Sequence, residues 1–327
     1  MFCKIAKTCY NIRMAKKENF HNKTLSNDFL GTPTAPRLAG EIFTATILLI
    51  LVISLVFSLF VVGNPGFENS DAYVYCSFLV PQLCFALALA FTWLRARPSL
   101  RVVVHKQKCH PKYFVVAILL QIGLFGLAEV NTLFLRWLGA FGYVDESIKI
   151  PSMEGFGFAF VLFVIAVLPA IFEESVFRGV MLNGLRSFGT VGAVLICGAL
   201  FALYHQNPAQ TLYQFCCGVA FAFVAIRSGS VLPTALSHCL NNAVVLTLTK
   251  FGVTEIVGVA QIVVYALSFV CLVGSLVWLI VFDKNTEQEQ PKTSVCDKKD
   301  FFSRASIGAL VCAVVWLAVL FEGITGA

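Results

Sequence analysis

The sequence has few charged residues. Only 13% of its 327 residues are Asp, Glu, Lys or Arg, whereas a typical soluble domain has about 25%. Apolar residues make up 58% of the chain, and the mean hydropathy is +0.82. This composition excludes a disordered chain, a nucleic-acid binder with a charged surface and nearly all water-soluble globular folds. It is typical of a protein whose surface lies in lipid.

The chain also lacks the motifs of common metal and nucleophile sites. Its twelve cysteines form no C-x-x-C pair, which argues against a structural zinc site or a disulfide framework. Neither G-x-S-x-G, H-E-x-x-H nor a Walker-type loop is present. We interpret most of the cysteines as small buried hydrophobes.

Long apolar runs follow one another along the sequence. Because a helix needs about 20 apolar residues to cross a bilayer, they predict an all-α polytopic membrane protein, a helical bundle with eight or nine transmembrane helices. The runs are near-continuous, unlike the alternating strands of a membrane barrel. The candidate spans are roughly residues 42–62, 73–94, 113–138, 156–186, 191–206, 211–227, 231–250, 256–282 and 305–322.

These runs divide the chain into four regions. A basic N-terminal segment (1–41) precedes N-terminal transmembrane helices (42–150) and a core with the chemically distinctive residues (151–255). C-terminal transmembrane helices (256–327) contain a polar loop at 283–304. Lysine and arginine are abundant before the first span and between the second and third, but sparse in the loops 63–72 and 139–155. Because short cytoplasmic loops are basic, we expect a cytoplasmic N-terminus.

Ionisable residues within apolar spans are costly and therefore indicate function. Glu173, Glu174 and Arg178 lie in the fourth span, and His205 ends the fifth. His238 and Asn242 lie in the seventh. Outside this set, Glu129 and Asn131 are the main polar residues noted within spans, and they have no assigned role.

The spacing of these residues predicts a shared site. Glu174 and Arg178 are four residues apart and should pair on one helical face, as should the side chains of His238 and Asn242. Glu173, rotated by about 100° from Glu174, can face another neighbour. An antiparallel turn near residues 187–192 would bring Glu173 level with His205. A carboxylate that deprotonates water, with imidazole and carboxamide donors for an oxyanion, suffices to hydrolyse an amide.

The three motifs resemble those of the CAAX prenyl protease type II and bacteriocin-processing (CPBP, also ABI) family of intramembrane proteases. The family pattern is E-E-x-x-x-R, F-x-x-x-H and H-x-x-x-N. Here it is carried by Glu173, Glu174 and Arg178, by Phe201 and His205, and by His238 and Asn242. The resemblance covers roughly residues 156–250.

The resemblance implies roles by position. Glu173 would activate water with help from His205, and His238 and Asn242 would stabilise the oxyanion. Glu174 and Arg178 would support them. No cofactor is then required. The alternative is zinc held by Glu173, His205 and His238, since the family was long described as metalloproteases.

The expected activity is an intramembrane endopeptidase that cleaves a membrane-attached, CAAX-like prenylated or hydrophobic peptide. Its partners would be this peptide and membrane lipid, with no nucleic acid. The membrane would be the plasma membrane of a bacterium or the endoplasmic reticulum of a eukaryote. Two other interpretations remain open: a non-catalytic bacteriocin self-immunity protein and a proton-coupled transporter, although neither an inverted repeat nor broken helices are evident for the latter.

Overall fold

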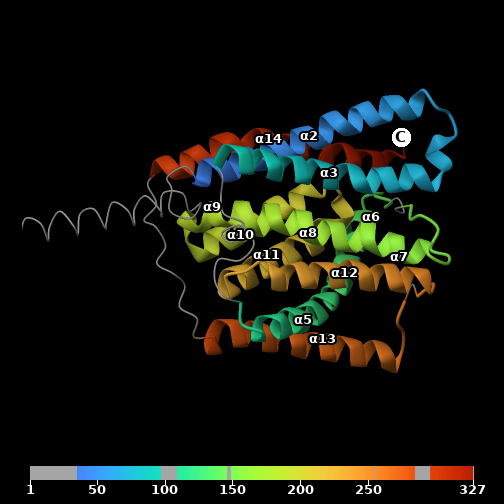
Figure 1. Cartoon of the computed structure of the whole chain (residues 1–327). Coiled ribbons are helices and arrows are strands. Elements are labelled where there is room, and N and C mark those ends of the chain that lie inside the picture. Colours follow the sequence, from blue (N-terminus) through green and yellow to red (C-terminus); the bar gives the residue numbers. More distant parts are fainter. Residues whose placement is uncertain (1–34, 97–108, 146–148, 254, 284–294, 327) are drawn as a thin grey trace, which may run out of the picture.

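The computed structural model describes residues 35–96, 109–145, 149–253, 255–283 and 295–326 (Figure 1). Within these ranges the regular structure is helical and contains no β-strand, which confirms the predicted all-α fold. In the described part of the chain, seven helices are long and apolar enough to cross a membrane, so the chain is an integral multi-pass membrane protein. The predicted basic N-terminal segment lies outside the described residues as far as residue 34.

The number of candidate spans in the structure, seven, is lower than the predicted eight or nine for two reasons. The segment Gly157–Tyr204 counts as one candidate of 48 residues, although the chain reverses inside it at η4 (Arg186–Phe188). Helix α12 (Leu232–Lys250) is not among the seven. It carries Thr234, Ser237, His238, Asn241 and Asn242, whose polarity lowers its hydropathy. The polar residues that indicate function are therefore also the reason why α12 is not apolar enough to count as a candidate span.

The helices lie side by side in three layers (Figure 1). The first contains α2 (Ala35–Val62), α3 (Asp71–Ala96) and α14 (Val295–Thr325). The third contains α5 (Lys112–Phe125) and α13 (Val259–Val277) with its extension η6 (Trp278–Phe282), whereas α6 (Leu127–Gly139) continues from α5 across the middle layer towards the first. Between them lie α7 (Gly157–Leu162), η2 (Phe163–Val167), α8 (Leu168–Glu174), η3 (Ser175–Met181), α9 (Leu182–Leu185), α10 (Gly189–Tyr204), α11 (Thr211–Ser228) and α12.

Two predicted boundaries differ from the structure. The third span, 113–138, is divided into α5 and α6 at Gly126. The polar loop predicted at 283–304 is helical from Val295 onward, because α14 extends its charged first turns beyond its apolar part. Residues 284–294 of that loop lie outside the described residues.

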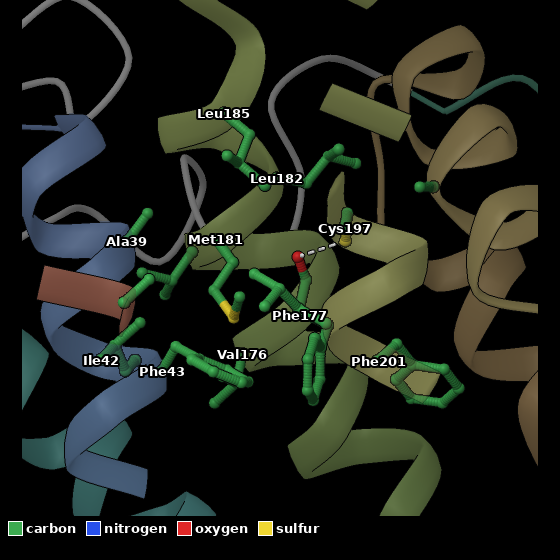
Figure 2. Packing of buried hydrophobic residues seen from close by; sticks show 14 of the residues in the cluster. Ala39, Ile42, Phe43, Val176, Phe177, Met181, Leu182, Leu185, Cys197 and Phe201 are labelled. Atoms are coloured by element: carbon green, nitrogen blue, oxygen red, sulfur yellow. Dashed lines mark hydrogen bonds between the residues drawn. The ribbon is translucent and has the colours of Figure 1, made fainter. Parts of the chain in front are cut away.

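Buried apolar side chains fix the middle layer against the first (Figure 2). Ile42 and Phe43 of α2 pack near Val176 and Met181 of η3. On the other side of η3, the Cys197 thiol donates to the Phe177 carbonyl at 3.5 Å. The segment that carries Glu173 and Glu174 is therefore held between α2 and α10. The cysteines whose side chains the structure describes, which exclude Cys296, are free.

Candidate active site

The helix that carries the two glutamates contains two π-helical segments. Glu173 and Glu174 end α8, with η2 before them and η3 after them. In η2 the backbone N–H of Leu168 donates to the Phe163 carbonyl, five residues earlier. Such π-turns are frequent at functional sites because they rotate the following residues relative to a regular helix.

Pro169 explains the first π-turn. Proline has no backbone N–H, and its ring clashes with the carbonyl four residues earlier, which is that of Ile165. That carbonyl accepts a hydrogen bond from Asn242 Nδ2 at 2.9 Å. A side chain on α12 thus replaces the helical donor that proline removes.

Glu173 is buried, with only 5% of its surface exposed, and both its oxygens face polar groups. Gln82 Nε2 of α3 donates to Oε1 at 3.1 Å, and the Tyr204 hydroxyl donates to the same oxygen at 3.4 Å. Oε2 lies 3.9 Å from Nε2 of His238. This last separation exceeds a direct hydrogen bond but suits a single bridging water.

Glu174 joins the other side of His238 to Arg178. Its Oε1 accepts from Arg178 Nη1 at 2.7 Å, which confirms the pairing predicted from the four-residue spacing. The same oxygen lies 3.0 Å from His238 Nδ1. A carboxylate paired with Arg178 acts as an acceptor, so Nδ1 carries the proton. The Nε2 atom of His238 is thereby directed towards Glu173.

Arg178 is fully surrounded by protein. Its guanidinium carbon lies 4.3 Å from the centre of the Phe201 ring and 5.3 Å from that of Phe221. Nη2 donates to the Gly218 carbonyl of α11 at 3.4 Å. Aromatic faces stabilise a cation, so the ion pair has favourable contacts on several sides.

His205 lies next to Phe201 and has no hydrogen bond to Glu173. Its Nδ1 lies 2.8 Å from the Phe201 carbonyl, and because a carbonyl only accepts, Nδ1 is the donor. The His205 and His238 rings both pack edge-on against Phe201, at centroid distances of 4.8 and 6.0 Å. Tyr204 rather than His205 contacts Glu173, so the end of α10 is level with Glu173, as the predicted turn requires.

Asn242 belongs to a chain of amides. Beyond its bond to Ile165, its Oδ1 accepts from Asn241 Nδ2 at 3.1 Å. Asn241 Oδ1 accepts in turn from Gln121 Nε2 of α5 at 2.9 Å and from the Tyr213 hydroxyl at 2.8 Å. Asn242 therefore points towards the helix that carries Glu173, as His238 does, but it contacts the backbone of that helix.

The sequence interpretation missed Gln82, Tyr204, Gln121 and Asn241. Gln82 and Gln121 are uncharged residues in long spans, and their only signal is an amide within an apolar run. The two residues that had no assigned role lie elsewhere. Glu129 accepts from the Tyr265 hydroxyl at 2.7 Å, and Asn131 donates to the Ala209 carbonyl at 2.9 Å.

Zinc requires three or four converging ligands. In the part of the chain that the structure describes, no group of three or more His, Cys, Asp or Glu side chains is placed to hold a metal ion. Glu173 and His238 face each other, and the Nδ1 of His205 is bonded to the Phe201 carbonyl, which leaves its Nε2 as the ring nitrogen that could bind a metal. The alternative zinc set Glu173, His205 and His238 stays a prediction.

Comparison with known families supports the resemblance seen in the motifs. Residues 155–244 match the model of the family described as type II CAAX prenyl endopeptidase Rce1-like. The matched stretch runs from just before α7 into α12 and contains all six candidate residues. Comparisons with curated proteins and with solved structures find no significant match.

Proposed function

We propose that this chain is an intramembrane endopeptidase that cleaves a membrane-attached peptide of the prenylated CAAX type by direct attack of water. The match to the prenyl endopeptidase family supports the reaction class. The observation that carries the proposal is the 3.9 Å separation of Glu173 Oε2 and His238 Nε2. Each of these groups is also fixed on its far side, by Gln82 and by Glu174.

In the proposed reaction Glu173 acts first as base. Oε2 takes a proton from a water located between Oε2 and His238 Nε2, and the resulting hydroxide adds to the peptide carbonyl carbon. The carbonyl electron pair moves to the oxygen, which becomes an oxyanion. When the C–N bond breaks, Glu173 returns its proton to the leaving amine. The products are a carboxylic acid, which keeps the second proton of the water until it ionises, and a free amine, with no covalent intermediate.

His238 stabilises the oxyanion in this scheme. Its Nδ1–H donates to Glu174, and the scheme requires a second proton on Nε2. The Nε2–H then donates to the developing negative charge. Such a hydrogen bond stabilises the charge most in a site with few waters. Arg178 keeps Glu174 ionised and in place. His205 assists through its Nε2, because its Nδ1 is already bonded to Phe201.

The proposal needs no metal ion, since the chain itself supplies the base and the oxyanion donor, and water is the nucleophile. The match to the prenyl endopeptidase family and the position of the site within apolar helices support this substrate class. A prenyl chain would keep the peptide in the bilayer, and the scissile bond would then enter the bundle from the membrane.

Cleavage of a synthetic peptide tests this function. The purified chain in detergent is mixed with a farnesylated peptide that ends in a CAAX sequence, or with the same peptide without farnesyl. We expect release of the C-terminal tripeptide from the farnesylated form. Glu173→Gln and His238→Ala should each lower kcat by at least about 100-fold, with normal folding.

Glu129→Gln provides the matched control, because Glu129 is another glutamate in a predicted span and is bonded only to Tyr265 among the described residues. It should leave cleavage unchanged. The assay is repeated after treatment with a zinc chelator. Full activity of Glu173→Gln would refute the proposed base, and loss of activity on chelation that zinc restores would refute the metal-free scheme.

A further inference from the structure

We propose that Asn242 is a positioning residue, and that Gln121 and Asn241 are two further ones. Together they fix the π-turn that sets the direction of Glu173. The catalytic readouts of this inference rest on the proposed function, whereas its structural readouts do not. It departs from the oxyanion role that the motif resemblance implies for Asn242.

The inference starts from the backbone at η2. Pro169 cannot donate to the Ile165 carbonyl, and an unpaired buried carbonyl would cost about 1–3 kcal/mol. Asn242 Nδ2 supplies a donor at 2.9 Å. The proline and the asparagine are 73 residues apart in the sequence. The proline removes a backbone donor from η2, and the asparagine supplies a side-chain donor in its place.

The π-turn matters for catalysis because of its place in the helix. Ile165 precedes Glu173 by eight residues, about 12 Å along the helix axis. If η2 relaxed to a regular α-helix, the residues after it would rotate by about 100° relative to α7. Glu173 would then no longer face Gln82 and His238. Fixing η2 thus fixes the base.

The remaining amides orient Asn242. Asn241 donates to Asn242 Oδ1, which leaves Nδ2 directed to Ile165. Asn241 is itself held by Gln121, which is 1% exposed, and by the Tyr213 hydroxyl. This amide chain, formed by Gln121, Asn241 and Asn242, connects α5 through α12 to η2. None of its bonds reaches the Glu173 carboxylate directly.

A rescue experiment separates positioning from oxyanion stabilisation. Asn242→Leu should lower kcat about tenfold or more without changing KM, and should speed deuterium uptake in peptides that span residues 163–170. Pro169→Ala restores a backbone N–H at residue 169 that can donate to Ile165. The double variant Asn242→Leu with Pro169→Ala should therefore recover to within about threefold of Pro169→Ala alone.

The remote amides provide a second arm. Gln121→Leu and Asn241→Leu should each lower kcat and speed uptake at residues 163–170, although neither residue contacts Glu173. Combined with Asn242→Leu, each should add little, because all three changes break the same chain. Thr247→Val is the matched control, since the Thr247 hydroxyl donates only to Ala243 within α12. It should change neither readout.

The outcomes are distinct. If Pro169→Ala is active and the double variant stays as slow as Asn242→Leu, Asn242 acts on the oxyanion and the inference fails. If Pro169→Ala is itself inactive, Gln121→Leu and Asn241→Leu decide, and normal kcat and uptake in both would overturn the inference. If the unmodified chain cleaves no peptide, the proposed function fails, whereas deuterium uptake still tests the amide chain.

Discussion

At the scale of single residues, Glu173 depends on two neutral donors that the recognised motifs do not specify. Gln82 and Tyr204 both donate to Oε1, at 3.1 and 3.4 Å. Because this oxygen is fixed from α3 and from α10, Oε2 is the one that faces His238. The position of the base is thus set by three helices besides its own.

We therefore predict that Gln82→Leu lowers kcat about tenfold with little change in KM, since a hydrogen bond to a charged group contributes about 1.5–3 kcal/mol. Tyr204→Phe should have a smaller effect because its bond is longer. The two changes should not be additive, because both remove donors to one oxygen. Steady-state kinetics of the two single variants and the double variant measure this. Additive effects would show that the donors act separately.

Glu174 and Arg178 lead to a prediction about stability. Both side chains are buried, so removing one partner leaves an uncompensated charge, at a cost of about 3–5 kcal/mol. Arg178→Met should therefore sharply lower the thermal unfolding midpoint of the purified chain. Arg37→Met removes one partner of a partly exposed pair, Arg37–Glu41. It should leave the midpoint nearly unchanged, because Glu41 keeps Arg95 as a partner. Equal midpoints in the two variants would contradict a buried pair with this role.

Single residues also show what the sequence could predict. The pairing of Glu174 with Arg178 followed from a four-residue spacing, because helix geometry alone determines which side chains are neighbours. The contact of His238 with both glutamates depends on how α12 packs on α8, which no spacing specifies. Gln82 was missed for the same reason: it lies 91 residues from Glu173 in the sequence, and an amide gives no motif.

At the scale of elements, α10 and α11 approach each other at two glycines. A Cβ on Gly218 would lie 2.8 Å from Gly198 Cα and 3.0 Å from its carbonyl oxygen. Backbone atoms cannot move aside as a flexible side chain can. Small residues of this kind let membrane helices pack closely, and here they also place the Gly218 carbonyl near Arg178.

Gly218→Ala should therefore destabilise the chain by about 1–3 kcal/mol and lower activity by displacing the carbonyl that Arg178 contacts. Gly274→Ala in α13 is the control, because a Cβ there meets no heavy atom within 4 Å among the described residues. Thermal unfolding and peptide cleavage are measured for both. A Gly218→Ala variant as stable as Gly274→Ala would contradict the close approach.

Elements also show the limit of prediction from apolar runs. The runs located most helices to within a few residues, since a bilayer requires their length and polarity. They could not locate the π-helical segments η2 and η3. The π-turn of η2 depends on Pro169 and on a partner from another helix. They also placed the start of the last helix ten residues late, because its first turns are charged and only the apolar part was recognised.

At the scale of the whole molecule, the two ends of the bundle differ in charge. One end contains the start of α2, the end of α3, the start of α5 and the turns after α9 and α11 (Figure 1). Its basic residues are Arg37, Arg95, Lys112, Arg186, Arg227, Lys298, Lys299 and Arg304. The other end is richer in acids, with Glu68, Asp71, Asp145, Glu154, Glu255 and Glu322, besides Arg136, Lys149 and Lys250.

This asymmetry predicts the orientation in the membrane. Basic residues in short connections are retained in the cytoplasm, so the end with Arg186 and Arg227 should be cytoplasmic. Helix α14 starts at that end and leads away from it (Figure 1). A reporter fused after the last residue should therefore lie outside the cytoplasm: alkaline phosphatase should be active there, and green fluorescent protein should be dark.

Truncation after Asp283 is the matched control, since it ends the chain at the basic end of α13 and η6. The same reporters should then give the opposite result, with fluorescence and no phosphatase activity. Removal of α14 takes away only the charges of α14 itself. The charges that orient the preceding helices stay in place. Fluorescence from the full-length fusion would show that charge at the basic end does not set the orientation.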